Sequence, residues 1–167
     1  MICFLKGQED QIAKNYEALE QEYSAHVNGE FGHIFKKSEY LMRVLKVKVP
    51  LTRRIREAYK SRDKVELQEI IKELKILKQV TEEFIEVYEE YHLHDNRGFG
   101  IEVNQLYMGS TIYRIKYAIR RIENFILNDE KIDELEDGVL RINYDPTITI
   151  HNSCMNDYRM LISYCIR

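Results

Sequence analysis

The chain has 167 residues, of which 32% are charged and 44% are hydrophobic, and its formal net charge is -3. This length suits one domain with a single core, and the composition excludes an intrinsically disordered chain. The negative net charge excludes the strongly basic surface that nucleic acids and anionic membranes bind, so we expect neither partner. With only 2 prolines and 7 glycines, the composition favours long helices.

The cysteines and the apolar runs bear on the compartment in which the protein works. The 3 cysteines, Cys3, Cys154 and Cys165, lie far apart, and this spacing fits neither a disulfide framework nor a zinc site. No apolar run approaches the roughly 20 residues that a membrane span needs. The apolar start of the chain is too short for the hydrophobic part of a signal peptide. We therefore expect reduced thiols and a cytoplasmic protein.

Apolar residues recur at helical spacing along the first part of the chain. A first stripe predicts a helix over residues 9–27, which a left-handed Gly29 would close. This stripe consists of Ile12, Tyr16, Leu19, Tyr23 and Val27. A second helix is predicted over 31–61, with Ile34, Leu41, Leu45, Ile55 and Tyr59 on its buried side. Pro50 lies inside this segment and predicts either one bent helix, which we prefer, or two helices.

Two further helices are predicted in the second half of the chain. Asp63 can cap the first of them and form a capping box with Glu66. Its seam comprises Leu67, Ile70, Leu74, Leu77, Thr81, Phe84, Tyr88 and Tyr91. The next helix is predicted to end at Asn128, with a seam of Met108, Ile112, Ile115, Ile119, Ile122 and Ile126. Such seams, separated by short breaks, indicate a mainly α fold, an antiparallel bundle of three to four long helices.

The character of the chain changes after Asp129. Short β-branched alternations at 139–144 and 147–150, and an apolar run at 158–166, are typical of strands. We therefore predict a helical bundle over 1–138 and a short β-rich C-terminal tail over 139–167. The strands of this tail would pack either on the bundle or on something absent from this chain, because isolated strands are marginal in water.

Two polar motifs lie near the break between the last two predicted helices. His92 and His94 would point to different sides of a helix, and no third ligand beyond Asp95 is evident, so we predict a solvated helix end and no metal site. Gly98 and Gly100 lack the third glycine of a dinucleotide loop and the lysine of a phosphate loop. We expect the glycines to let the chain turn while Phe99 fills the gap between the helix ends.

No catalytic group stands out in the sequence, and no cofactor is expected. The carboxylate pairs at 82–83 and 89–90 flank seam residues, where solvation is the expected state. No serine lies in a nucleophile elbow, and Cys154 lacks a convincing base beyond the nearby His151. The basic cluster at 53–56 predicts a solvated face or an interface with an acidic partner. An enzyme in its own right would need a pocket that the sequence does not indicate.

The break from Asp95 to Gly109 reads D-N-R-G-F-G-I-E-V-N-Q-L-Y-M-G. It resembles a signature near the C-terminal end of bacterial glycoside hydrolase family 20 enzymes, which are β-N-acetylhexosaminidases with a helical domain after the catalytic barrel. Segments 51–63 and 157–163 are similar to a helix end and to the closing strand of the same enzymes. The chain departs from the family pattern at Gly98 (usually proline), Asn104 (aspartate), Tyr107 (arginine) and Ser110 (glycine).

This resemblance implies a C-terminal accessory module without catalytic residues of its own. In these enzymes an Asp–Glu pair on the barrel performs a substrate-assisted hydrolysis, and no position here matches that pair. A barrel also needs roughly 250 residues, more than this chain holds. The implied partner is the barrel of a glycosidase or a second copy of the chain. The candidates for an interface or cleft edge are Arg97, Phe99, Glu102 and Tyr107. The alternative is a stand-alone helical protein-protein interaction or dimerisation module.

Overall fold

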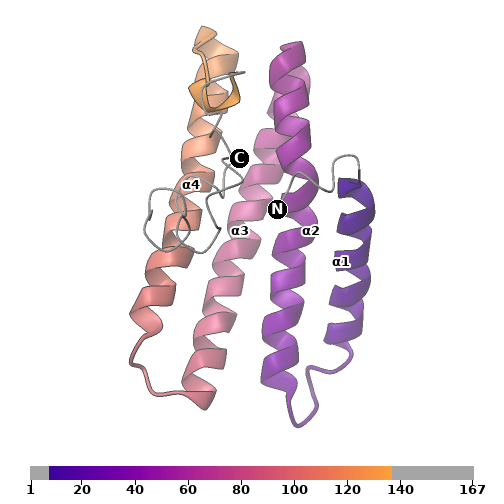
Figure 1. Cartoon of the computed structure of the whole chain (residues 1–167), viewed down its shortest axis with the longest axis vertical. Coiled ribbons are helices and arrows are strands. Elements are labelled where there is room, and N and C mark those ends of the chain that lie inside the picture. The colour runs from indigo at the N-terminus through magenta and orange to yellow at the C-terminus, as the bar shows by residue number, and fades with distance from the viewer. Residues whose placement is uncertain (1–7, 137–167) are drawn as a thin grey trace, which may run out of the picture. The chain divides into compact units, whose positions relative to one another are not determined.

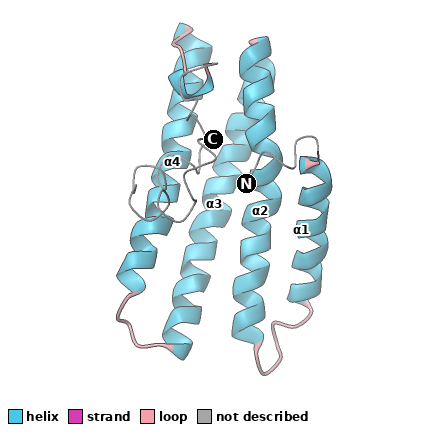
Figure 2. Ribbon diagram, in the orientation of Figure 1, coloured by secondary structure: helices cyan, strands magenta, loops and turns pink. Residues whose placement is uncertain are grey.

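A computed structural model describes residues 8–136, which form four α-helices and one short 3-10 helix. The helices are α1 (Glu9–Ser24), α2 (Gly32–Ser61), α3 (Lys64–Asp95), α4 (Ile101–Asn128) and the 3-10 helix η2 (Asp133–Leu135). The chain divides into two compact units after Glu130, and α1 to α4 belong to the first. Within residues 8–136 there is no strand (Figure 2), and no helix is long and apolar enough to cross a membrane.

Helices α1 to α4 lie side by side in chain order, and we call them the helical layer (Figure 1). Each packs against its neighbour in sequence, and the short turns make neighbouring helices antiparallel. Thus α2 and α3 lie in the middle while α1 and α4 form the edges. The predicted bundle of long helices is confirmed. The predicted β-rich tail over 139–167, and with it the predicted domain boundary, lies outside the described residues.

The core follows α3 and the sides of α2 and α4 that pack around it. Its side chains repeat every third or fourth residue because this spacing keeps them on one side of a helix. The buried residues of α3 and α4 are Leu67, Ile70, Ile71, Leu74, Leu77, Thr81, Val87, Ile112, Ile115, Ile119, Ile122 and Phe125. Most of both predicted seams is therefore confirmed, and the Thr81 hydroxyl is satisfied by donating to the Leu77 carbonyl.

The seam predictions fail toward the helix ends. On α3, Phe84, Tyr88 and Tyr91 are only half-buried. On α4, Phe125 rather than Ile126 is the fully buried residue, and its ring lies 4.7 Å from the Tyr59 ring of α2. This contact between α2 and α4 lies beside the start of α3, and there the buried side of α4 moves from position 126 to position 125.

α2 continues through Pro50 as one helix, which confirms the preferred alternative. Its predicted buried side is largely wrong, because only Tyr59 of the predicted residues is fully buried. The buried apolar residues spaced along it are Val44, Leu51 and Ala58. Since α2 packs against α1 on one side and α3 on the other, most of its surface is half-buried and a single apolar stripe does not identify its core.

The turn between α1 and α2 differs from the prediction. α1 ends at Ser24, and a chain of backbone hydrogen bonds, each spanning three residues, follows as far as Gly32. Gly29 therefore has no left-handed conformation to adopt. The glycine that the turn requires is Gly32, because a Cβ there would lie 2.0 Å from the Val27 carbonyl oxygen.

Ion pairs join α2 to α3 near the turn between them. The Arg54 guanidinium donates to Glu66 at 2.8 Å and to Glu73 at 2.6 Å. Asp63 caps α3 by accepting from backbone N–H groups of its first turn. The reciprocal half of the predicted capping box is absent, since the Glu66 carboxylate binds Arg54 and the Asp63 N–H donates to the Ala58 carbonyl.

The basic cluster at 53–56 also finds most of its partners within the chain. Arg53 pairs with Asp10 of α1 at 3.1 Å and with Glu57 of α2 at 3.0 Å. Together with the Arg54 pairs, these contacts replace the predicted solvated face or acidic partner protein for both arginines. Only Arg56 of this cluster is largely exposed. Glu57 is a local partner on α2, whereas the other carboxylates come from α1 and α3, which the linear sequence separates from the cluster.

Replacing Phe125 by alanine tests the junction of α2, α3 and α4. Phe125 is 2% exposed, so Phe125→Ala removes buried apolar area and leaves a cavity. We expect the free energy of unfolding, measured by urea denaturation, to fall by about 3–5 kcal/mol. The matched control is Leu127→Ala, at a side chain that is 77% exposed. That control should change stability by less than about 0.5 kcal/mol, and equal losses in the two variants would contradict the described core.

Candidate functional site

The α3–α4 turn, residues 96–100, carries the motif on which the family resemblance depends. Gly100 precedes α4 with a φ of 88°, in the left-handed region that glycine adopts without steric cost. Its N–H donates to the Glu102 carboxylate at 3.0 Å, which closes the turn. Gly98 lies outside the left-handed region, and a Cβ there would meet only the Leu93 side chain, at 3.9 Å. The prediction that glycine permits the turn therefore holds for Gly100 alone.

Phe99 does not fill the gap between the helix ends, because its side chain is 87% exposed. The turn is too short to fold the ring back under the helices, and Glu102 already closes it by a hydrogen bond. Gln105 of α4 instead ties the helices together by donating to Glu89 of α3 at 2.8 Å. The structure places all of the predicted interface candidates, Arg97, Phe99, Glu102 and Tyr107, on the surface at this end of the helical layer.

A second apolar stripe follows the side of α4 that faces away from its isoleucine seam. We call it the α4 outer face, and it consists of Val103, Leu106, Tyr113 and Tyr117, which are 51%, 71%, 74% and 42% exposed. Helical spacing puts these positions about 180° from the buried isoleucines. Helical spacing was a sufficient signal for Val103 and Leu106, since they follow Phe99 in steps of four and three residues, but neither was predicted from the sequence.

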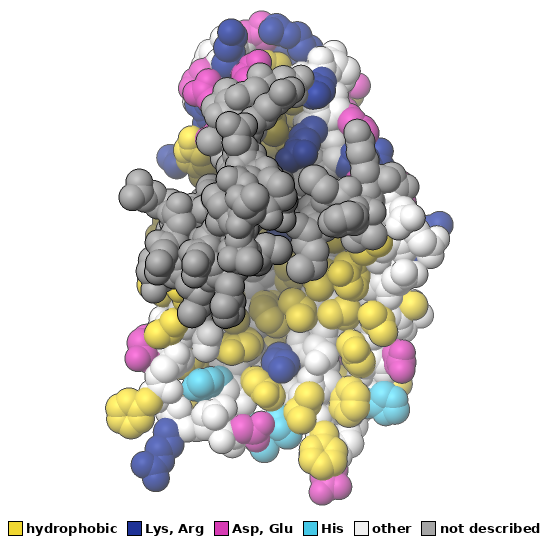
Figure 3. All heavy atoms as spheres, in the orientation of Figure 1, with side chains coloured by type: hydrophobic (Ala, Val, Ile, Leu, Met, Phe, Trp, Pro, Cys, Tyr) yellow, Lys and Arg dark blue, Asp and Glu magenta, His cyan; other side chains and the backbone are white. Residues whose placement is uncertain are grey.

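Hydrophobic side chains also gather on the broad side of the helical layer. Figure 3 shows them across the lower middle of the face in view, where Figure 1 shows the lower parts of α2 and α3. An array of helices packed mainly on sequence neighbours buries less of each helix than a closed bundle does. The half-buried aromatic residues of α3 are one result of this arrangement.

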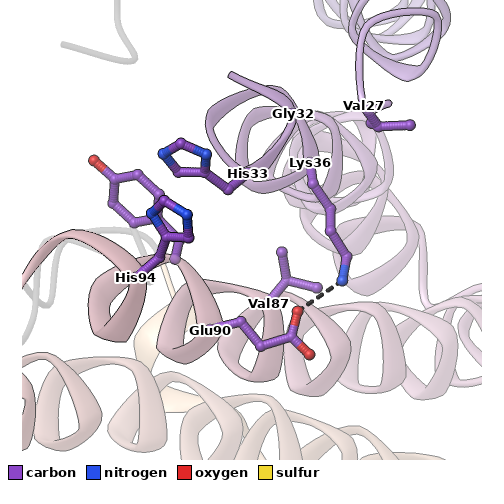
Figure 4. A pocket seen from close by; sticks show the side chains of 8 residues that line it. Val27, Gly32, His33, Lys36, Val87, Glu90 and His94 are labelled. Carbon is purple, nitrogen blue, oxygen red and sulfur yellow. Dashed lines mark hydrogen bonds and ion pairs between the residues drawn. The ribbon is translucent and has the colours of Figure 1, made fainter. Parts of the chain in front are cut away.

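A cluster of polar side chains occupies the place where α2 begins and α3 ends. His33 Nε2 lies 3.2 Å from one oxygen of Asp95, and His94 Nδ1 lies 2.7 Å from the other. The two imidazole rings stack with their centroids 4.0 Å apart, as the facing rings in Figure 4 show. The hydrogen bond with His94, helped by the charge of His33, lowers the pKa of Asp95. We call these residues the His33–His94–Asp95 cluster.

A hollow of about 300 Å³ adjoins this cluster between α2 and α3. Across it, Lys36 of α2 donates to Glu90 of α3 at 2.7 Å (Figure 4). The Lys37 ammonium lies 3.9 Å from the centre of the Tyr91 ring, and that ring in turn stacks on His33. These contacts hold the start of α2 against the end of α3.

The cluster changes the interpretation of the two histidines at the end of α3. His92 lies against the Tyr88 ring and takes no part in the cluster, as its spacing from His94 predicts. The prediction that no further ligand is near was wrong, however, because His33 comes from the start of α2. No local sequence signal links His33 to His94, since only the antiparallel packing of α2 and α3 brings them together.

The carboxylate pairs of α3 take part in structural contacts. Each carboxylate has a partner: Lys78 pairs with Glu82, Gln79 donates to Glu83, Gln105 donates to Glu89, and Lys36 donates to Glu90. Each of these partners is a cation or an amide at a helix surface. Within residues 8–136, the pairs therefore do not form the isolated carboxyl dyad in a pocket that a glycosidase uses.

A family model described as the glycoside hydrolase 20C C-terminal domain matches residues 3–155. The match includes α1 to α4, the α3–α4 turn and both surfaces described above. No curated protein matches the chain. The match agrees with the resemblance carried by the residues of the α3–α4 turn.

Substituting the two glycines of the turn separates their roles. Gly100→Ala forces a side chain into the left-handed region and should reduce the free energy of unfolding by about 1–2 kcal/mol. Gly98→Ala meets neither positive φ nor a close contact. It should alter stability by no more than about 0.5 kcal/mol. Urea denaturation of both variants measures the difference, and a larger loss for Gly98→Ala would refute the described turn.

Proposed function

We propose that this chain, which belongs to the family of glycoside hydrolase 20C C-terminal domains, is the non-catalytic accessory module of a β-N-acetylhexosaminidase. The catalytic barrel of such an enzyme removes terminal N-acetylhexosamine residues, and the module packs against the barrel or borders its substrate cleft. The observation that carries this proposal is the family match, which extends over all of α1 to α4. The contacts that occupy the carboxylates of α3 are consistent with chemistry located elsewhere.

The α4 outer face, continued by Phe99 and Tyr107, is the surface that we assign to the barrel. Burying a leucine, valine or aromatic side chain of this kind contributes roughly 1.5–3 kcal/mol, so the exposed stripe favours a partner. Tyrosines suit such an interface because a phenol ring provides apolar area while its hydroxyl keeps a polar partner or water. Arg97 and Glu102 lie at the edge of this stripe and would supply its polar rim.

A second copy of the chain is the alternative occupant of the same face. The observation in its favour is that the stripe follows one side of an edge helix at nearly heptad spacing. Two such stripes could pair across a two-fold axis, since a symmetric dimer uses the same patch twice. This alternative corresponds to a stand-alone dimerisation module.

The proposed accessory role predicts that the purified chain alone does not hydrolyse a chromogenic N-acetylglucosaminide. The physical reason is that a glycosidase needs an acid held protonated beside the scissile bond, and the carboxylates of α3 are engaged in surface contacts. Release of the chromophore is followed by absorbance, with a complete family 20 enzyme as the positive control. Turnover by the isolated chain that persists through further purification would disprove the accessory role.

Leu106→Glu tests the assigned surface. Co-expression with the family 20 barrel encoded in the same genome should give a complex on size exclusion chromatography. The charge in the centre of the α4 outer face should weaken that complex by roughly 30-fold or more, the effect of losing an interface hot spot. The matched control is Ile76→Glu on α3, because Ile76 is 52% exposed but belongs to another helix.

The outcomes of this experiment separate the two occupants. A complex that Ile76→Glu leaves intact and Leu106→Glu disrupts supports the barrel. A chain that elutes alone as a dimer, and becomes monomeric with Leu106→Glu, supports the second copy instead. Equal effects of both substitutions would reject the α4 outer face as the interface.

A further inference from the structure

We propose that the His33–His94–Asp95 cluster binds a divalent transition-metal cation of the zinc type. This inference is independent of the proposed accessory role. It rests on the position of two imidazoles, which Figure 4 shows facing each other, and of the Asp95 carboxylate beside them.

The spacing of the donor atoms fits a single small cation. One nitrogen from each histidine and one carboxylate oxygen all lie within 4.8 Å of one another. Zinc binds nitrogen and oxygen ligands at 2.0–2.2 Å, so two ligands of one tetrahedral ion lie about 3.3 Å apart. His33 Nε2 lies 3.2 Å from one oxygen of Asp95, which is close to this value, and His94 Nδ1 lies 2.7 Å from the other oxygen. Rotation of the exposed His94 ring adjusts the remaining distances without moving the backbone.

The chemistry of the donors selects the class of cation. Imidazole nitrogen suits zinc, copper and nickel, whereas magnesium and calcium prefer sites made of oxygen ligands. The His33 and His94 nitrogens that face Asp95 lie at the distance at which N–H groups donate to a carboxylate, so a bound cation would take the place of those protons. A divalent ion would use both rings as neutral ligands and balance part of its charge with Asp95.

The surroundings support binding and leave open positions on the metal. The Tyr91 ring stacks on His33 at 6.0 Å and restrains its orientation. Lys36, the nearest ammonium in the hollow, is paired with Glu90, which reduces its repulsion of a cation. The His94 side chain is 60% exposed, so ions have direct access and water would complete the coordination. The bound ion would join the start of α2 to the end of α3.

Isothermal titration of the full chain with zinc chloride tests the proposal, with magnesium chloride as the control cation. We expect one equivalent of zinc to bind and magnesium to give no response. His33→Asn and His94→Gln each remove a ligand. The zinc affinity should fall at least as far as it does when a residue that only orients a ligand is lost, which is roughly 10- to 100-fold. The matched controls are His26→Asn and His92→Gln, which change histidines outside the cluster and should leave the affinity unaltered.

Thermal unfolding gives a second readout that distinguishes loss of the site from loss of the fold. Zinc should raise the Tm of the unmodified chain and of both controls, but not that of His94→Gln, since a ligand stabilises only the state that binds it. His94 is exposed, so this variant keeps its fold and carries the test even if His33→Asn does not. Zinc affinity unchanged in His94→Gln would place the ion on other donors, such as Cys154 and His151, and would overturn the proposal. An equal response to magnesium would overturn it as well.

Discussion

The helical layer depends on burying the apolar stripe of α3 between α2 and α4. A lone helix is marginally stable in water, and α3 gains its stability from Leu67, Ile70 and Leu74, which are at most 4% exposed. To cover this stripe, α2 and α4 must each present an apolar side to α3. The Arg54 ion pairs and the Asp63 cap then fix how α3 starts against α2. The order and direction of α2, α3 and α4 follow from this one requirement.

An array of helices packed mainly on sequence neighbours leaves apolar side chains exposed along its edge helices, as α4 shows within residues 8–136. α1 has no fully buried residue, and α4 carries one stripe toward α3 and another away from it. A self-sufficient bundle would instead close and bury both sides of its outer helices. The exposed stripe on α4 therefore gives the proposed accessory role a physical basis, because packing against a larger domain would bury it.

One end of the helical layer carries the candidate sites described above. There His33 and Lys36 of α2 contact Asp95 and Glu90 of α3, and the α3–α4 turn follows Asp95 directly. Both helix-to-helix connections at this end require glycine, at Gly32 for close approach and at Gly100 for a positive φ. His33 directly follows Gly32, and Asp95 ends α3 a few residues before Gly100, so the cluster lies beside both of these turns.

The sequence by itself determined the helices, because apolar spacing and the Asp63 cap are local signals, and the residues around Gly100 were enough to indicate the family. It also placed most of the seams of α3 and α4. It could not locate the core of α2, since a helix with two neighbours has no single stripe. The exposure of Phe99, the partners of Arg53 and Arg54, and the approach of His33 to His94 were decided only by the tertiary structure. Each depends on which helices become neighbours, and packing between distant segments, not local spacing, determines that.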